Sequence, residues 1–441
     1  EFRDVLLGKK TRSDLSVEAR RLGGYDASLA TLVRDDSAVE KGHLTPISHI
    51  LSSGSELALQ FWWRWEYTRD RQWLAESAYP LMKECAEFYM SFAKLGPDQR
   101  MHVYPSNVHE SFLGVRDSIS DLAAIRGLFP VLIQASEILA VDALQRAKWK
   151  AFLQKLAPYP MGDNPLAQQL GASLGPGRWA AGLFAGIAGK RNTEEVWTMP
   201  VFPFEDVTDD SHNEENWKIA NYTYRSLPQR ATLLGGGGPE LLDEGKVPVH
   251  SRLPILAARL GRPDEVRRIL PAFAALVQRS PNGMPSGDPG MSMVEGLGIP
   301  AFALQEALLQ STGGLIQLFP AWPDEWDAQF RLRTRGAFIV SASKRKNVTE
   351  LVEIESLAGE TCHIWNPWSG QVFLYADGKL RSKLKGDVLE FPTTRGEILL
   401  LLPRSTRSPR IRMDVFPPPS GIQELKVVFP SEQVLHTQLG K

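Results

Sequence analysis

The stretch Ser311-Thr312-Gly313-Gly314 separates two parts of the sequence that have different hydrophobic patterns. Over residues 47–310, apolar side chains recur at three- and four-residue spacing in one segment after another, which predicts amphipathic helices. After residue 314, apolar and polar side chains alternate in short runs, which predicts β-strands. The change of period therefore predicts a mainly α fold in which a helical domain is followed by a β-domain.

Short loops that are polar or rich in Pro and Gly join the predicted helices, so consecutive helices should pack as antiparallel hairpins. This many hairpins predict a toroid of helices whose loops gather at one mouth. The predicted helices cover residues 50–67, 74–92, 119–139, 143–156, 180–187, 214–227, 253–260, 265–277 and 298–309.

Turn signals such as Lys346-Asn347 and Asp377-Gly378 separate the predicted strands, which together predict an antiparallel β-sandwich. The strands cover residues 315–319, 330–334, 337–342, 349–356, 360–364, 371–375, 388–391 and 397–402. We expect four parts: an irregular segment at 1–46 that could be the remnant of a longer chain, the helical domain at 47–312, the sandwich at 313–403 and a Pro- and Arg-rich extension at 404–441.

Composition narrows the class of partner. The 441 residues carry a formal net charge of -1, so no overall field attracts nucleic acid or an anionic membrane surface. No uninterrupted run of 18 apolar residues predicts a membrane span. Nucleotide-binding fingerprints, the nucleophile elbow and metal-ligand spacing among the histidines are all missing, so no cofactor or metal ion is predicted. The 12 Trp residues could fill cores or stack on sugar rings.

A polar segment with acid–base potential lies between two predicted helices: Tyr104-Pro105-Ser106-Asn107-Val108-His109-Glu110-Ser111-Phe112. It is predicted to be an active-site loop, because Pro105 interrupts helix and Glu110 could protonate a leaving group. Tyr104, Asn107 and His109 would contact the substrate. The alternative is an ordinary connection between helices whose polar side chains are solvated or cap the next helix.

If the leaving group that Glu110 protonates belongs to a glycosidic bond, hydrolysis of that bond needs a second carboxylate. Glu295 is the candidate for this second group. It ends a loop rich in Gly and Pro and precedes a predicted helix. In an inverting enzyme it would activate water as the general base, and the two carboxyl groups would stand about 6.5–9.5 Å apart. The alternative is a first-turn carboxylate that the helix dipole favours.

Four further side chains are candidates for substrate binding: Glu56, Trp62, His212 and Trp217. Glu56 could orient sugar hydroxyls or form an ion pair with an Arg. His212 and Trp217 belong to a polar cluster at residues 206–217, where Ser211 or Asn213 could instead cap the following helix.

Several segments resemble glycoside hydrolase family 95, the inverting α-L-fucosidases and α-L-galactosidases. Residues 55–92 resemble a helical hairpin of that family, and residues 105–110 resemble its Ser-Pro-Glu-Asn loop, which carries the general acid. Residues 121–129 are similar to the following helix, and Glu295-Gly296-Leu297-Gly298 lies where the family has Asp-Gly-Asn-Phe-Gly. Residues 307–323 and 335–338 then follow the family into its C-terminal β-domain.

The resemblance covers roughly residues 45–400 and implies an (α/α)6 six-hairpin toroid followed by the β-domain. It implies Glu110 as acid, Glu295 as base and hydrolysis of a terminal sugar, α-L-fucosyl or α-L-galactosyl, from an oligo- or polysaccharide. It also favours a secreted or periplasmic protein, although Glu1-Phe2-Arg3-Asp4 does not resemble a signal peptide.

The sequence departs from the family pattern at three places. The acid at the base position is Glu and is followed by Gly296-Leu297, the family's His-x-His-Leu-Ser-His loop is not recognisable, and residues 1–47 lack an Asn-x-Asn pair. The interpretation is therefore a divergent relative that could be truncated and inactive in this form. Two alternatives stay open: a polysaccharide lyase and a non-catalytic carbohydrate-binding relative. The lyase would use Asn107, His109, His212, Tyr222 and Arg225.

Overall fold

A computed structural model of the chain describes residues 50–186, 189–190, 195–209, 213–234, 250–277, 294–406, 426–428 and 434–436. The chain divides into two compact units, residues 1–232 and 233–441. The predicted boundary between the helical and β-domains, at residues 312–313, falls inside the second unit and stays a prediction.

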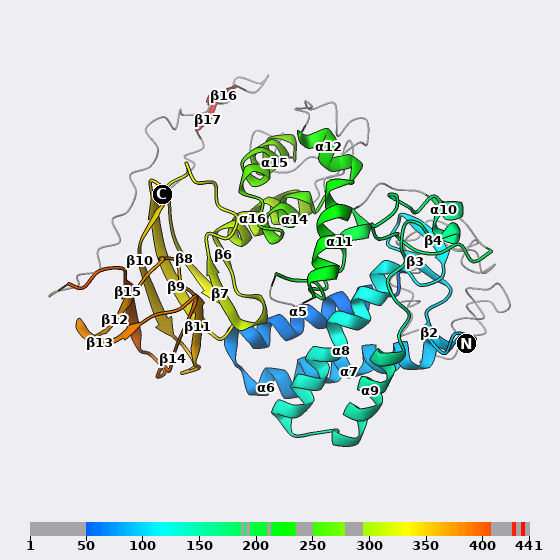
Figure 1. The fold of residues 1–441 in the computed structure, drawn as a ribbon, viewed down its shortest axis with the longest axis horizontal. Helices are drawn as coiled ribbons and strands as arrows, with labels where there is room; N and C mark the ends of the chain where they lie inside the picture. Colours follow the sequence, from blue (N-terminus) through cyan, green and yellow to red (C-terminus); the bar gives the residue numbers. More distant parts are fainter. Residues whose placement is uncertain are drawn as a thin grey trace. The chain divides into compact units, whose positions relative to one another are not determined.

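Helices make up most of the described part of the first unit (Figure 1). They are α5 (Ser53–Thr68), α6 (Arg71–Trp73), a π-helical turn (Leu74–Ala78), α7 (Tyr79–Phe92), α8 (Ile119–Leu139), α9 (Ala143–Lys155), α10 (Pro165–Leu170), a 3-10 turn (Val196–Thr198), α11 (Glu214–Arg225) and α12 (Pro228–Leu234), whose last residues enter the second unit. Local chemistry explains their ends. Arg69 ends α5 in a left-handed conformation, and the side chain of Asp70 caps α6.

α8 is the central helix of this unit and packs against α5, α7 and α9. It is long and apolar enough to cross a membrane by length and composition alone. More than half of the apolar stretch is nevertheless buried inside the protein, and the core helix of a soluble protein passes the same test. The same core contains the fully buried side chains of Trp62, Tyr89 and Phe129.

One predicted helix of this unit is wrong. In the described part of residues 180–187 the backbone is extended, and it forms isolated β-bridges from Ala180 to Ser173 and from Leu183 to Arg116. Arg116 and Leu183 exchange both backbone hydrogen bonds, at 3.0 and 2.9 Å. Gly182 permits this approach, because a β-carbon there would lie 2.9 Å from the side chain of Val115.

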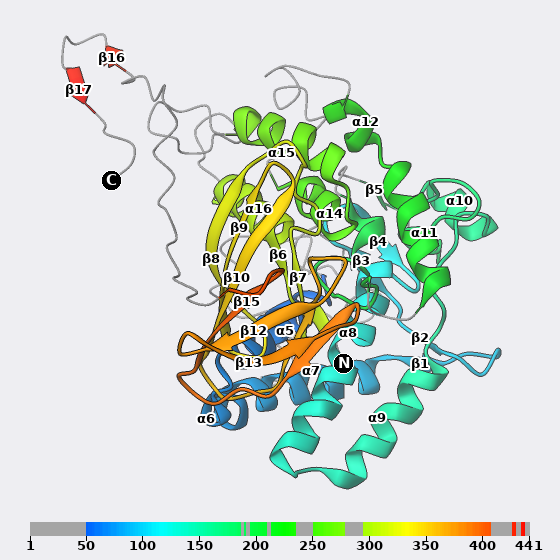
Figure 2. The same cartoon turned by 60° about the vertical axis from the view of Figure 1, so that its left-hand side comes forward.

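Small strands complete the first unit. A two-stranded sheet consists of β1 (Lys94–Leu95) and β2 (Met101–His102). A three-stranded sheet has the order β3 (Ser106–Val108), β4 (Phe112–Val115) and β5 (Gly189–Lys190). β3 contacts α8, and Figure 2 shows β3 and β4 in cyan.

In the described part of the second unit, three helices pack on one another: α14 (Leu253–Arg259), α15 (Pro263–Val277) and α16 (Glu295–Leu308). A buried ion pair ties α14 to α16, because Arg259 Nε lies 2.6 Å from Glu306 Oε2. These helices confirm the helical period predicted before residue 310.

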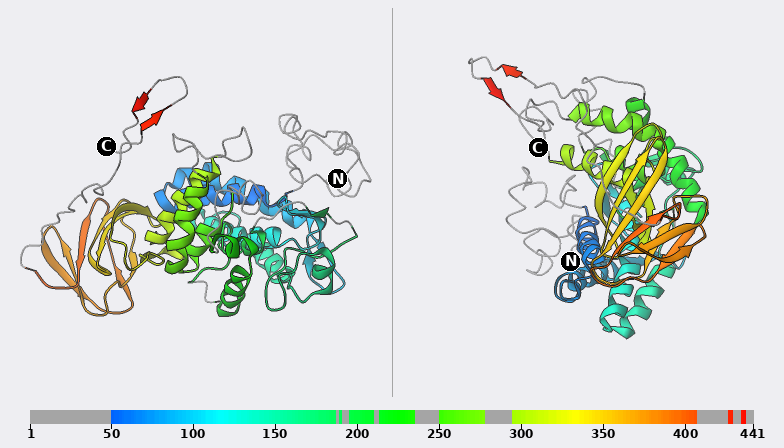
Figure 3. Two further views of the ribbon diagram at one scale, coloured as in Figure 1. Left: turned by 90° about the horizontal axis from the view of Figure 1, so that it is seen from above. Right: turned by 90° about the vertical axis from the view of Figure 1, so that its left-hand side faces the viewer.

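Two sheets form the β-region of the second unit, which Figure 3 shows in yellow to orange. The six-stranded sheet has the order β13 (Lys379–Leu384), β12 (Val372–Ala376), β15 (Ile398–Leu402), β10 (Val348–Ser356), β9 (Phe338–Arg345) and β8 (Ala328–Thr334). The four-stranded sheet has the order β14 (Val388–Phe391), β11 (Cys362–Trp365), β7 (Leu315–Leu318) and β6 (Leu309–Gln310). Both sheets contribute to one hydrophobic core, as in a β-sandwich. β16 (Lys426–Val428) pairs with β17 (Val434–His436).

Two details of the predicted β-domain need correction. The sheets are not wholly antiparallel, because β7 pairs with β11 in parallel, with Leu315 opposite His363 and Ile316 opposite Ile364. The sequence also gave no signal for β13. Its residues, Lys379–Leu384, are mostly exposed and basic, so they lack the alternation of a half-buried strand.

Candidate functional site

The segment predicted as an active-site loop is a β-hairpin. β3 and β4 pair through Ser106 opposite Val115 and Val108 opposite Phe112, and the backbone N–H of Ser111 donates to the carbonyl of Val108 at 3.0 Å. The tip is therefore only three residues, His109-Glu110-Ser111. The structure corrects the loop prediction because pairing with β4 satisfies the backbone groups that a loop would expose to water.

His109 and Glu56 form the most direct polar contact at the tip. Nε2 of His109 lies 2.9 Å from Oε1 of Glu56, which projects from the first turn of α5. The side chains are 16% and 23% exposed, respectively, so solvent reaches both only in part. Two predicted substrate residues, 53 positions apart in sequence, are thus neighbours in the fold. Glu56 thus contacts a His. The alternative interpretation, an ion pair with an Arg, stays a prediction.

Glu110 follows His109 at the tip and is partly exposed. His109 has a backbone φ of 45°, a left-handed conformation that lets the chain reverse direction between the paired strands. The candidate acid is therefore carried on a tight, hydrogen-bonded turn. Tyr104 lies just before β3, partly buried, and its hydroxyl donates to the carbonyl of Ala185 at 3.2 Å.

Burial argues against two of the predicted direct substrate contacts. Asn107 is fully buried, and its Oδ1 accepts the backbone N–H of Gly114 at 3.0 Å, which braces the hairpin. Trp62 is 2% exposed and belongs to the core of the helices. Neither side chain offers a face on which a sugar could rest.

A buried carboxylate lies behind the hairpin. Oδ1 of Asp121 accepts the hydroxyl of Tyr89 at 2.9 Å, and Oδ2 accepts the hydroxyl of Ser106. Burial raises the pKa of Asp121 to about 6, although the hydrogen bonds from Ser106 and Tyr89 lower it. Burial, with the nearby Asp121 carboxylate, also raises the pKa of Tyr89 well above its ordinary value.

The sequence analysis missed Asp121 as a site residue. Its position in the first turn of α8 is that of an ordinary helix-start acid, and the N-cap Ser118 beside it strengthens that interpretation. The available signal was an acid placed among the apolar residues at the start of α8, because such a carboxylate is buried and needs hydrogen-bond donors from neighbouring elements.

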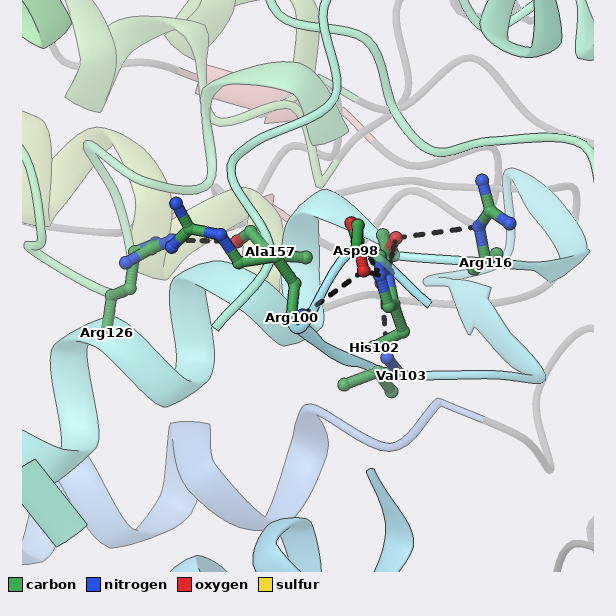
Figure 4. Close-up of polar contacts among 8 residues, drawn as sticks. Asp98, Arg100, His102, Val103, Arg116, Arg126 and Ala157 are labelled. Atoms are coloured by element: carbon green, nitrogen blue, oxygen red, sulfur yellow. Dashed lines mark hydrogen bonds and ion pairs between the residues drawn. The ribbon is translucent and has the colours of Figure 1, made fainter. Parts of the chain in front are cut away.

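A second polar cluster fixes the chain on either side of the hairpin (Figure 4). Nδ1 of His102 lies 2.6 Å from Oδ2 of Asp117, and Nε2 lies 3.0 Å from Oδ1 of Asp98. The other oxygen of Asp117 accepts the backbone N–H of Val103 at 3.1 Å. Burial lowers the pKa of His102, but the hydrogen bonds with the two carboxylates outweigh it and the net pKa is raised. The cluster joins the residues before β3 to those between β4 and α8.

The remaining candidates lie elsewhere. Glu295 is the exposed first residue of α16 in the second unit, so it occupies a helix N-terminus as the alternative interpretation expected. His212 lies outside the described residues, as does Ser211. The side chain of Asn213 caps α11 by accepting the backbone N–H of Asn216 at 3.0 Å, which confirms the capping role. Trp217, in the same helix, is partly buried. Tyr222 and Arg225 are exposed on this helix.

Among the described residues, no cluster of three or more His, Cys, Asp or Glu side chains could hold a metal ion. Around the hairpin, the described residues offer a carboxylic acid, a His–carboxylate pair and hydroxyl groups. Such a set can transfer protons and can hydrogen-bond a polyhydroxylated ligand.

Residues 27–169, which include the hairpin and α8, match the glycosyl hydrolase family 95 catalytic domain. The chain is a divergent relative of family 95. This family 95 relative is 26% identical over 310 residues to Alpha-L-fucosidase 2 of Arabidopsis thaliana, an alignment that covers 65% of the chain and 34% of the plant protein. It thus spans about a third of the length of that curated relative.

Two solved structures show a distant likeness to the family 95 relative. A putative kojibiose phosphorylase from human microbiome aligns with a TM-score of 0.40 and 12% identity, over 77% of this chain and 49% of that chain. The Streptomyces avermitilis alpha-L-rhamnosidase complexed with L-rhamnose aligns with a TM-score of 0.39 and 14% identity, over 79% of this chain and 32% of that chain.

Proposed function

We propose that this chain is a glycoside hydrolase that removes a terminal sugar from an oligo- or polysaccharide, with Glu110 as the general acid. The observation that supports this role best is the placement of Glu110. It is a partly exposed carboxyl at the tip of a hairpin that helix α8 supports, and it is adjacent in sequence to the His109–Glu56 pair. An acid held in this way can meet a glycosidic oxygen without a large loss of conformational entropy.

The His109–Glu56 pair would orient the substrate. A carboxylate that accepts an imidazole N–H fixes the plane of the ring, so a ring edge and a carboxylate edge are presented in one geometry to sugar hydroxyls. In this proposal Tyr104 and Trp217 add further substrate contacts, as does His212. Protonated Glu110 would donate its proton to the leaving oxygen as the bond to the anomeric carbon breaks.

Glu295 would act as the general base, which removes a proton from the water that attacks the opposite face of the sugar and so inverts its configuration. The sequence resemblance at residues 295–298 and the exposure of the side chain support this assignment. We further propose that the helices belong to an (α/α)6 toroid. Terminal α-L-fucosyl and α-L-galactosyl groups are the first substrates to test, because the plant relative is named an α-L-fucosidase.

The test is a screen of aryl α-L-fucosides, α-L-galactosides and other aryl glycosides with the full-length protein. Wild type should turn over at least one of them, and NMR should show that the first-formed product has inverted anomeric configuration. Glu110→Gln should lower kcat about 10²-fold or more, and Glu84→Gln, which changes an exposed carboxylate on α7, should not.

The leaving group makes this test specific for an acid. A 2,4-dinitrophenyl glycoside needs no protonation, so Glu110→Gln should retain most activity on it, whereas Glu295→Gln should lose activity on both substrate types. Equal loss by Glu110→Gln on both types would contradict the acid role. Products that absorb in the ultraviolet would indicate a lyase, and glycan binding without any turnover would indicate a non-catalytic relative. Either result would overturn the proposed hydrolysis.

A further inference from the structure

Asp121 connects three elements of the first unit through one carboxyl group. It belongs to the first turn of α8, and its two oxygens accept hydroxyls from Tyr89 on α7 and Ser106 on β3. Its side chain is fully buried. A side chain so placed does not contact the substrate, so we assign it no direct proton transfer to the substrate.

Ser106 makes this contact relevant to the tip of the hairpin. It opens β3, three residues before His109 and four before Glu110. The hairpin is also closed on itself by Asn107, which accepts the N–H of Gly114. A change in the position of Ser106 therefore changes the position of the tip, because the two are joined by a short pair of hydrogen-bonded strands.

We propose that Asp121 is a positioning residue whose ionised carboxylate, by accepting hydrogen bonds from Ser106 and Tyr89, holds the hairpin that presents Glu110, and whose protonation loosens it. This inference rests on the proposed function, because it concerns the acid of that reaction. An ionised carboxylate accepts from both hydroxyls at once. A protonated one must donate through one oxygen, so one of the two hydroxyls has to turn from donor to acceptor.

Two of the titratable groups near Asp121 keep a constant charge near pH 6. Tyr89 and Cys85 on α7 stay neutral there, because burial raises the pKa of both, that of Cys85 to about 11. From the hairpin, His109 interacts electrostatically with Asp121, and His109 is itself paired with Glu56 of α5. Since the pKa of Asp121 is about 6, the change in hydrogen bonding falls within the range of pH in which a glycosidase is assayed.

The experiment measures kcat/KM against pH for wild type, Tyr89→Phe, Asp121→Asn and Tyr159→Phe. Tyr89→Phe removes one donor to the ionised carboxylate without touching the hairpin, so the midpoint of the acid limb should rise by about one pH unit. Asp121→Asn should lack the acid limb, and its kcat/KM should equal the low-pH value of wild type at every pH. Tyr159→Phe is the matched control, because Tyr159 donates at 2.7 Å to another carboxylate with a raised pKa, that of the partly buried Asp206. Its profile should match wild type.

Hydrogen exchange separates this inference from the proposed function. In wild type, the protection of the Gly114 N–H against exchange, corrected for the intrinsic rate, should fall about tenfold from pH 7 to pH 5. In Asp121→Asn, the protection should have the low value at both pH values. That result with no turnover of any glycoside would sink the proposed hydrolysis and keep Asp121 as the hairpin's support. An unchanged acid limb in Tyr89→Phe, or protection that does not depend on pH in wild type, would overturn the inference.

Discussion

Replacing Asp121 by Asn should change how the stability of the protein depends on pH. The pKa of this carboxyl is raised from 3.8 to about 6 by burial, so the folded state binds a proton more tightly than the unfolded state between these values. Stability that comes from this proton is present below pH 4 and is lost as pH rises toward 6. A shift of about two units corresponds to about 3 kcal/mol.

Asn occupies nearly the same volume and carries no charge, and the hydroxyls of Ser106 and Tyr89 can each donate or accept. The free energy of unfolding of Asp121→Asn, relative to wild type, should therefore increase by about 3 kcal/mol between pH 4 and pH 7.5. Urea unfolding at a series of pH values tests this. Eight of the 12 Trp residues lie within residues 1–232, so Trp fluorescence follows mainly the unit that contains Asp121.

Because the chain has two units, the transition of the first must be resolved from that of the second before a free energy is assigned. Tyr159→Phe provides the comparison, since it alters a partly buried Tyr–Asp pair but leaves Asp121 intact. A difference between Asp121→Asn and wild type that is the same at pH 4 and pH 7.5 would refute the reasoning. It would mean that Asp121 titrates alike in the folded and unfolded chains.

Two further predictions concern packing and capping. Gly127→Ala should lower the free energy of unfolding by about 2–3 kcal/mol, because a β-carbon there clashes with the backbone carbonyl of Phe204, whereas Gly298→Ala, in open space on a helix, should raise it by about 0.5–1 kcal/mol. Differential scanning calorimetry of both variants tests this prediction. Equal melting temperatures for Gly127→Ala and Gly298→Ala would contradict the predicted clash. Asn213→Ala removes the cap of α11 and should cost about 1 kcal/mol, measured by chemical denaturation; Asn213→Asp should retain most of it.

Helices with a strong period and a clear start were the best predicted part of the fold. The helix expected at residues 119–139 is α8, Ile119–Leu139, because Ser118 marks its start and apolar side chains fill most of its faces. The segment at 180–187 has a similar apolar content, but its backbone pairs with Arg116, far away in the sequence. Local propensity cannot anticipate a partner of that kind, which explains why the prediction was wrong.

The same distinction applies to the candidate site. Residue type selected Glu56, His109 and Glu110, because acids and His next to aromatic residues suit carbohydrate chemistry, and the family resemblance also implied Glu110. The contact between Glu56 and His109 depends on how α5 packs near the hairpin, which the spacing of residues does not reveal. Burial likewise argues against direct substrate contact by Asn107 and Trp62. The sequence does not show that Asn107 braces the backbone of the hairpin or that Trp62 lies in the core.

Asp121 has an energetic cost that its proposed role would account for. At neutral pH its ionised form lowers stability by about 3 kcal/mol relative to a neutral group in the same place. An apolar or amide side chain would avoid that cost, so stability alone does not explain an acid at this position. If the ionised carboxylate holds the hairpin, Asp121→Asn should be more stable at pH 7.5 and also slower, a combination that packing damage cannot produce. A variant that is both more stable and fully active would show that the acid is dispensable.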